Sequence, residues 1–179
     1  GKILFASDLH GRTLRAEFLL DAIEREKPDY IVYLGDYMYN GPRNGVPNDY
    51  EPMMLSKMIN EYASKSYGVE GNCDSRIDHS LLKFPISLTL DAIINGKTVT
   101  MYHGDEASTK AISIGLKDVY IFGHTHVHRI DKTGMTTFVN PGSIGFPKDK
   151  TNGSYAVWEG NTITIKELED GNVLLEKTL

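Results

Sequence analysis

The chain has 179 residues and a mass of 20.0 kDa, a size that predicts one domain spanning residues 1–179. A hydrophobic content of 40% and a charged content of 24% are typical of a soluble globular protein. The net charge of −5 and the absence of any run of basic residues argue against binding to duplex nucleic acid.

Other features concern the cellular setting. No run of about 18 apolar residues occurs, so we expect no transmembrane helix and no membrane partner. A single cysteine, Cys73, excludes an internal disulfide and suits a reducing compartment. The N-terminal segment reaches Asp8 too early for a secretory signal. We therefore expect a cytoplasmic protein.

The first half of the chain alternates between strands and helices. Short apolar runs predict strands at residues 2–6, 30–34 and 67–70. Apolar residues at helical spacing predict a helix over about residues 14–23, closed by Pro28, and a second helix over about residues 54–62. This βαβαβ order predicts a parallel sheet.

The second half consists mainly of expected strands, with one helix at about residues 106–115. Gly160-Asn161 and Asp170-Gly171 are typical of hairpin turns. The strands are expected at residues 86–90, 98–102, 118–122, 135–139, 154–158, 161–167 and 172–176. A chain that begins as βαβ and ends in antiparallel strands predicts an α/β fold in which two β-sheets pack together with helices outside.

Side chains that commonly bind metals follow five of the expected strands. They are Asp8 and His10, Asp36, Asn72 and Asp74, His103, and His124 and His126. Functional groups gather at the carboxyl ends of strands in open α/β sheets, so we expect these side chains to meet at one edge. Singly, Asp8 is explained as well by a helix N-cap, His10 by a loop and Asp36 by a turn. The repeated placement favours one shared site.

The stretch IFGHTHVHR, residues 121–129, places His124, His126 and His128 at alternate positions. If the stretch is extended, all three imidazoles point to one face. A metal site, a base for a nucleophile and a polar sheet surface are all consistent with this pattern.

Nitrogen and oxygen donors without thiolates suit Mn²⁺, Fe or Zn²⁺, and not a structural zinc site built from cysteines. These candidate ligands exceed one tetrahedral site and suit two ions that share a bridging carboxylate. Two metal ions about 3.5–4 Å apart are suited to in-line displacement at phosphorus.

Five motifs, SDLHG, LGD, GNCD, YHGD and GHTH, occur in this order over residues 7–126, and NPGS follows at residues 140–143. Together they resemble the calcineurin-like metallophosphoesterases. The short length, GNCD and GPRN (residues 41–44) are similar to the small bacterial phosphodiesterases of the YfcE type. The resemblance implies two packed mixed β-sheets flanked by helices, an αββα sandwich. It also implies hydrolysis of a small phosphate diester by a hydroxide that bridges two divalent metals, with Mn first and Fe, Zn or Ni as alternatives.

The resemblance also implies a role for each motif residue. One metal would be held by Asp8, His10, Asp36 and His126, and the other by Asp36, Asn72, His103 and His124, so that Asp36 bridges. His128 and His79 lie outside the motifs, and we interpret them as a strand residue and a surface or helix residue. Asn140 and Ser143 are expected in a turn that supports the site.

Cys73 departs from many relatives, which carry histidine there beside the residue equivalent to Asp74. A protonated histidine stabilises the transition state and helps the leaving alkoxide depart, and a thiol does not supply that charge. We therefore expect a preference for diesters or good leaving groups, with Asn72, Cys73 and Asp74 as catalytic candidates. The alternative for Cys73 is a small buried residue without a chemical role.

Arg43 is the candidate substrate contact, because a guanidinium matches phosphate oxygens, and the alternative is a solvated loop arginine. Two other functions are weighed: a non-catalytic protein-binding scaffold on the same fold, and a phosphomonoesterase. The complete set of ligands favours an enzyme. Apolar residues in the segment 37–54 are consistent with either a homo-oligomer contact or a substrate wall.

Overall fold

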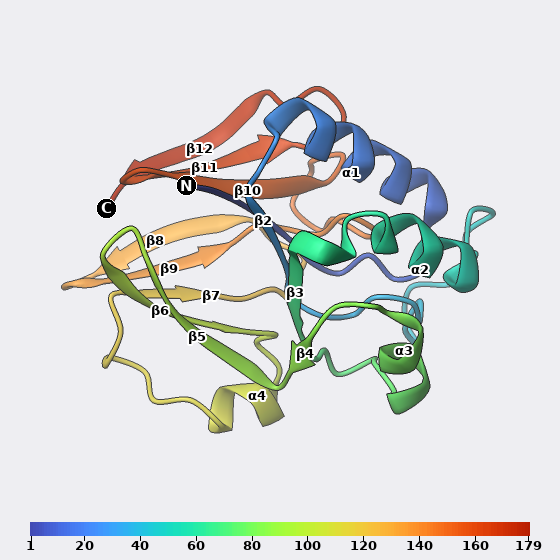
Figure 1. The fold of residues 1–179 in the computed structure, drawn as a ribbon, viewed down its shortest axis with the longest axis horizontal. Helices are drawn as coiled ribbons and strands as arrows, with labels where there is room; N and C mark the ends of the chain where they lie inside the picture. The colour runs from blue at the N-terminus through green and yellow to red at the C-terminus, as the bar shows by residue number, and fades with distance from the viewer.

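Two β-sheets pack face to face in the computed structural model, which describes residues 1–179 (Figure 1). The larger sheet has the strand order β12-β11-β10-β1-β2-β3-β4. Its strands are β1 (Lys2–Ala6), β2 (Tyr30–Tyr33), β3 (Ser66–Val69), β4 (Ile86–Ser87), β10 (Ser154–Glu159), β11 (Thr162–Glu167) and β12 (Val173–Thr178). Strands β1 to β4 are parallel, and β10 joins β1 antiparallel, so the sheet is mixed.

The smaller sheet has the strand order β5-β6-β7-β9-β8. Its strands are β5 (Thr89–Ile94), β6 (Lys97–Tyr102), β7 (Val119–Ile121), β8 (Arg129–Thr133) and β9 (Thr136–Asn140). The antiparallel arrangement expected for the second half is wrong at the centre of this sheet: strands β6, β7 and β9 are parallel, and the β5 and β8 edges are antiparallel. The two mixed sheets flanked by helices confirm the fold class expected from the sequence.

Alternate residues of the central strands face different layers, as strand geometry requires. In β1, Leu4 and Ala6 face the helices, whereas Phe5 faces the other sheet. The layer between the sheets is completed by Val32 from β2 and Val99 from β6, both buried. Because both faces of β1 are covered, residues 3–6 are an uninterrupted apolar run and not an alternating one.

The helices α1 (Thr13–Glu26) and α2 (Pro52–Asn60) cover the outer face of the larger sheet (Figure 1). Leu19 of α1 and Leu55 of α2 are fully buried there. The remaining helices are short: the 3₁₀ helix η1 (Ala63–Lys65), α3 (Arg76–Leu81) and α4 (Glu106–Lys110). No helix is both long enough and apolar enough to cross a bilayer.

The expected strand at residues 86–90 is wrong as a single element. The chain leaves the larger sheet after β4 and enters the smaller sheet at β5, so Leu88 lies at the crossing. The helix expected at about residues 106–115 ends at Lys110 instead. The following loop folds over Tyr120, whose hydroxyl donates to the carbonyl of Ser113 and accepts from the amides of Leu116 and Lys117.

The helices η1 and α3 and the strand β8 were not predicted. A capping box begins α3, in which Ser75 and Asp78 each accept from the other's backbone N–H. This S-x-x-D signal is present in the sequence. Strand β8 is an edge strand with mostly exposed residues, so no alternation of apolar and polar side chains marks it.

Candidate metal centre

The carboxyl ends of β1, β2, β3, β6 and β7 lie along one edge, and the loops that follow them carry the candidate ligands. Three groups of metal-binding side chains form there, and the donor atoms within each group lie within 4.8 Å of one another. They are Asp8 with His10 and His126, Asp36 with His103 and His124, and His10 with Asp36 and Cys73. The structure therefore brings together the side chains that the strand-end pattern grouped.

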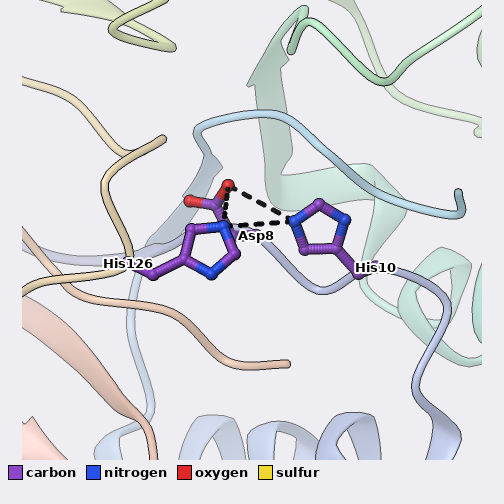
Figure 2. Close-up of side chains that lie close together, drawn as sticks. All are labelled: Asp8, His10 and His126. Atoms are coloured by element: carbon purple, nitrogen blue, oxygen red, sulfur yellow. Dashed lines mark hydrogen bonds and ion pairs between the residues drawn. The ribbon is translucent and has the colours of Figure 1, made fainter. Parts of the chain in front are cut away.

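The first group joins two loops that are far apart in sequence (Figure 2). Oδ1 of Asp8 lies 3.3 Å from Nε2 of His126 and 3.7 Å from Nε2 of His10. The two imidazoles face each other, with their Nε2 atoms 3.3 Å apart. All three side chains are buried, so these donors face one another and not bulk water.

The second group has its donors equally close. Nε2 of His103 lies 3.2 Å from Nδ1 of His124, and Oδ1 of Asn72 lies 2.9 Å from the former and 3.1 Å from the latter. Oδ2 of Asp36 is 3.2 Å from Nε2 of His103. Oxygen and nitrogen atoms therefore converge from the ends of four strands.

Asp36 lies between the two groups. Its Oδ2 is 3.6 Å from Nε2 of His10 in the first group, in addition to its contact with His103 in the second. Its other oxygen, Oδ1, accepts a hydrogen bond of 2.9 Å from the backbone N–H of Cys73. The carboxylate is thus fixed with one oxygen turned towards the imidazoles of both groups.

Five candidate ligands adopt the left-handed backbone conformation. Their φ values are 56° for Asp8, 52° for His10, 57° for Asp36, 69° for His124 and 62° for His126. Such residues cost roughly 1–3 kcal/mol each and cluster at functional sites. An extended stretch that turns all three histidines to one face is therefore not what forms. Strand β7 ends at Ile121, and His124 and His126 turn into different groups.

Glycines allow the strand ends to come this close. A Cβ on Gly35 would lie 2.6 Å from the backbone nitrogen of Gly71 and 2.7 Å from Nδ1 of His103. Gly35 also has a φ of 97°, which disfavours other residues. The glycine before Asp36 is thus needed for both its conformation and the approach of the β2 and β3 loops.

Backbone carbonyls fix the orientation of three imidazoles. Nδ1 of His10 bonds to the carbonyl of Tyr39 at 2.7 Å, and Nδ1 of His126 bonds to that of Phe146 at 2.6 Å. Nδ1 of His103 bonds to the carbonyl of Leu34 at 2.6 Å. Because a carbonyl oxygen only accepts, we assign the proton to Nδ1 in each ring, which leaves the Nε2 lone pairs facing the centre.

These atoms fit a bound divalent cation. Oδ1 of Asp8 is buried and accepts no hydrogen bond. Around it lie imidazole nitrogens with free lone pairs. Hydrogen-bond acceptors therefore lie at hydrogen-bond distance from one another with no donor between them. A buried carboxylate is costly without a compensating charge, and imidazole and carboxylate are the ligands that Mn²⁺, Fe and Zn²⁺ accept. The orphaned oxygen and the carbonyl-bound imidazoles are the arrangement that ligating residues require.

The electrostatics of the cluster favour bound positive charge. Burial works against ionisation of Asp8, yet the adjacent His10, His126 and His103 hold the pKa of this carboxyl well below its usual range. Burial likewise lowers the pKa of His103, but the contact with Asp36 and the charges of Asp8 and Asp36 raise it to about 10. In the absence of a metal, the same field therefore attracts protons.

Asp74 supports the centre and does not line it. Its carboxylate accepts from the backbone N–H groups of Asp36, Tyr37 and Gly71 at 2.7–2.9 Å. Burial and the nearby charge of Asp36 raise the pKa of Asp74 to about 6, against the effect of these donors. The sequence grouped Asp74 with Asn72 and Cys73 as catalytic, whereas its contacts make it a positioning residue that joins the β2 and β3 loops.

Cys73 is half-buried at the edge of the centre. Burial, followed by the charges of Asp36, Asp74 and Asp8, raises the pKa of its thiol to about 12. The side chain is therefore a neutral thiol. This agrees with the expectation from the sequence, in which Cys73 takes the position of the histidine that many relatives carry. The backbone N–H of Cys73 donates to Asp36.

The turn at residues 140–143 supports two of the loops. Nδ2 of Asn140 donates to the carbonyl of Gly123 at 2.9 Å, and Oγ of Ser143 donates to the carbonyl of Asp8 at 2.9 Å. Both side chains are buried. These contacts agree with the supporting turn expected from the sequence.

The centre opens into a hollow of about 370 Å³. Besides the donor residues, Arg43 and Lys148 line it, and both are exposed. Arg43 therefore lies where a substrate contact was expected. Lys148 was missed, because nothing in its local sequence marks it; its loop is brought to the site by the bond from its N–H to the carbonyl of His126.

Two further histidines lie outside the centre. Nδ1 of His128 is 2.7 Å from Oδ2 of Asp149, a hydrogen bond in the loop before β8, so His128 is not a strand residue. His79 is in α3, in agreement with the expected helix or surface position.

Comparisons with known proteins agree on one family. A family model described as a calcineurin-like phosphoesterase superfamily domain matches residues 2–162. The chain is 32% identical to phosphodiesterase YfcE of Escherichia coli strain K12 over 177 residues, which cover 98% of this chain and 96% of that protein. It is 26% identical to the probable metallophosphoesterase MG207 of Mycoplasma genitalium over 162 residues, covering 84% and 82% of the two chains.

Solved structures give the same result. The phosphoesterase Yfce from E. coli superposes with a TM-score of 0.90 at 31% identity, over 99% of both chains. Vacuolar protein sorting 29 from Cryptosporidium parvum superposes with a TM-score of 0.65 at 19% identity, covering 99% of this chain and 98% of that one. The second likeness concerns the fold alone.

Proposed function

The chain belongs to the calcineurin-like phosphoesterase superfamily, and from that membership we propose that it is a metal-dependent phosphodiesterase that cleaves a small phosphate diester. The family and the full-length similarity to a phosphodiesterase support hydrolysis of phosphoester bonds. The observation that carries the finer assignment is the position of Asp36, with Oδ2 3.2 Å from His103 and 3.6 Å from His10.

The proposed ligands divide into two sets that share Asp36. One set is Asp8, His10, Asp36 and His126, and the other is Asp36, Asn72, His103 and His124. The distances support this division, because each set contains its own facing pair of ring nitrogens, at 3.3 Å and 3.2 Å. Two cations bound there would supply Lewis-acid activation of water and of the phosphoryl group.

The protein's own groups orient and neutralise the substrate. Arg43 and Lys148 both line the hollow beside the proposed ligands, where their charges compensate the negative phosphoryl oxygens. The Cys73 N–H donates to the Asp36 carboxylate, and the Asp74 carboxylate accepts from the Asp36 N–H. The side chain of Asp36 and the loop that carries it therefore need not rearrange during the reaction. Preorganisation of this kind is the main protein contribution to phosphoryl transfer.

The neutral thiol at position 73 supports a diester substrate. A thiol with a pKa of about 12 does not give a proton readily to a departing alkoxide near neutral pH, and it adds no positive charge. A diester carries one fewer negative charge than a monoester dianion and demands less charge compensation. Esters whose leaving groups depart without protonation are therefore the expected substrates.

The test is parallel hydrolysis of bis-p-nitrophenyl phosphate and p-nitrophenyl phosphate, first with added Mn²⁺ and then with a chelator. We expect cleavage of the diester that the chelator abolishes, with little cleavage of the monoester. Preferential cleavage of the monoester would identify a phosphomonoesterase instead. Cleavage of neither by protein shown to contain metal would favour a non-catalytic scaffold.

A further inference from the structure

A second hollow, of about 380 Å³, adjoins the metal centre. Its walls come from the loop after β2, the turn before α2, and the segment from the β3 loop to the start of α3. Cys73 lines both this hollow and the one at the metal centre, and it is the residue that they have in common. A ligand with its phosphoryl group at the centre could therefore extend past Cys73 into the second hollow.

The chemistry of the two hollows differs. The hollow at the centre includes the cationic residues Arg43 and Lys148. No lysine or arginine lines the second hollow, and its one charged residue is Asp78, which caps α3. A second anionic group would find no partner there and would be repelled by Asp78. A neutral group is the suitable occupant.

The walls are suited to a flat apolar group. They include Met38, Tyr39, Tyr50 and Pro52. Aromatic side chains and methionine interact favourably with aromatic rings, through stacked or edge contacts and through sulfur. Tyr39 is 45% exposed, so a large part of it is available to a ligand. The side chain of Cys73 forms a soft wall between the two hollows.

The second hollow is fixed relative to the metal centre. The carbonyl of Tyr39 accepts the 2.7 Å bond from Nδ1 of His10. Tyr50 packs so closely on Gly11 that a Cβ there would lie 2.5 Å from Cε1 of the ring. The N–H of Glu51 also donates to the carbonyl of Gly11. Both tyrosines are thus tied to the loop that carries His10, so the two hollows keep their spacing.

We propose that the second hollow is a subsite for a neutral aromatic substituent of the ester, whose phosphoryl group binds at the metal centre. This inference rests on the proposed function. It narrows the substrate class to esters that combine one phosphoryl group with a flat uncharged group, and it excludes esters with a second phosphate on that side.

The test measures binding of phenylphosphonate and methylphosphonate to Mn²⁺-loaded protein by isothermal titration calorimetry. The two ligands share the phosphonate and differ only in the substituent. We expect phenylphosphonate to bind about tenfold more tightly, because burial of its ring against aromatic side chains stabilises the complex. Tyr39→Ala should reduce this preference about fivefold, whereas Tyr39→Phe should retain it, because the ring and not the hydroxyl is required.

Val46→Ala is the matched control, because Val46 belongs to the same loop, is 75% exposed and lines neither hollow. It should leave the preference unchanged. Equal affinities for the two ligands in the wild type, or a preference that Tyr39→Ala does not alter, would overturn the subsite. If such a result comes from wild-type protein that still cleaves the diester, the subsite is rejected and the proposed function stands. If the wild type binds neither phosphonate and does not cleave the diester, the proposed function is rejected as well.

Discussion

Nε2 of His10 and Nε2 of His126 face each other at 3.3 Å, although both rings use Nδ1 to donate to backbone carbonyls. Two lone pairs therefore point at the same position, beside the buried and unpartnered Oδ1 of Asp8. The backbone holds both histidines there with positive φ angles. A protein keeps three acceptors in contact only if a cation or protons compensate them, which is the basis of the first two predictions.

Divalent metal should stabilise the fold measurably. A ligand at about 100 times its dissociation constant adds about 2.7 kcal/mol, which corresponds to a rise in Tm of roughly 5–10 °C for a chain of this size. We expect Mn²⁺ to produce such a rise in differential scanning fluorimetry and His126→Ala to remove most of it. His79→Ala, which changes a histidine of α3 outside the centre, should keep the full shift. An equal shift in both variants would argue against the first ligand set.

Asp36→Asn should reduce the number of bound metal ions. The asparagine is of equal size and keeps an oxygen for the Cys73 N–H, but it removes the negative charge shared by the two donor groups. We expect metal content, measured by mass spectrometry of dialysed protein, to fall from about two ions per chain to one or fewer, and kcat to fall at least about 100-fold. Asp149→Asn is the control, because the Asp149 carboxylate contacts His128 outside the metal centre. This variant should keep the wild-type metal content. An unchanged metal content in Asp36→Asn would contradict a bridging role.

The sequence predicted which side chains converge but not how they are held. Asp8 and Asp36 each follow an apolar strand of the βαβαβ half, and parallel strands end at one edge, so their convergence follows from periodicity and order. His103 follows β6 of the smaller sheet, so its arrival at the same place depends on how the two sheets pack. The carbonyls of Tyr39, Phe146 and Leu34 that orient the imidazoles carry no sequence signal, because any residue supplies a carbonyl.

Other features depend on contacts far apart in the chain. The left-handed conformations of His124 and His126 are set by packing at the centre, because non-glycine residues adopt them only uncommonly. Lys148 reaches the hollow only because its loop is bonded to the His126 carbonyl. The division of residues 86–94 between two sheets likewise reflects tertiary pairing, since β4 and β5 are separated by one residue and pair with different sheets.

Arg43→Ala and Lys148→Ala should each weaken substrate binding. Both residues are exposed, so each charge is partly screened by solvent, and we expect KM for bis-p-nitrophenyl phosphate to rise about fivefold per variant. Raising the salt concentration should reduce both effects. Arg76→Ala removes an equally exposed arginine that does not line the hollow and should leave KM unaltered. A variant with the wild-type KM would remove that residue from the substrate site.

Cys73→His should raise turnover of esters with poor leaving groups. Sγ of Cys73 lies beside the hollow, and a histidine placed there, near the carboxylates of Asp36 and Asp74, would carry a proton that the thiol does not give. We expect about a tenfold increase in kcat for such esters, less than the roughly 100-fold or more that an optimally placed general acid contributes. The measurement is the dependence of kcat/KM on leaving-group pKa, which should become shallower. Cys73→Ser is the control of similar size, and an identical slope in wild type and Cys73→His would leave Cys73 without a chemical role.

Glu26→Gln should destabilise the protein at neutral pH and much less in acid. Lys166 binds both carboxylate oxygens of this buried residue at 2.8 and 2.9 Å, and Tyr155 donates to one at 3.1 Å. Burial would raise the pKa of Glu26, but contacts with Lys166, Tyr155 and Lys2 lower it below its usual range. Because the folded pKa is lower than the unfolded value of about 4.3, the contribution is complete above that value and is lost as the pH falls through the folded pKa.

We therefore expect Glu26→Gln to lower the free energy of unfolding by about 2 kcal/mol at pH 7, a value between those of exposed and fully buried ion pairs. Urea denaturation at pH 7 and near pH 3 measures the difference. Glu17→Gln, on the exposed side of the same helix, should change the stability little at either pH. A deficit of the same size at both pH values would show that shape, and not the charge of Glu26, is what the site requires.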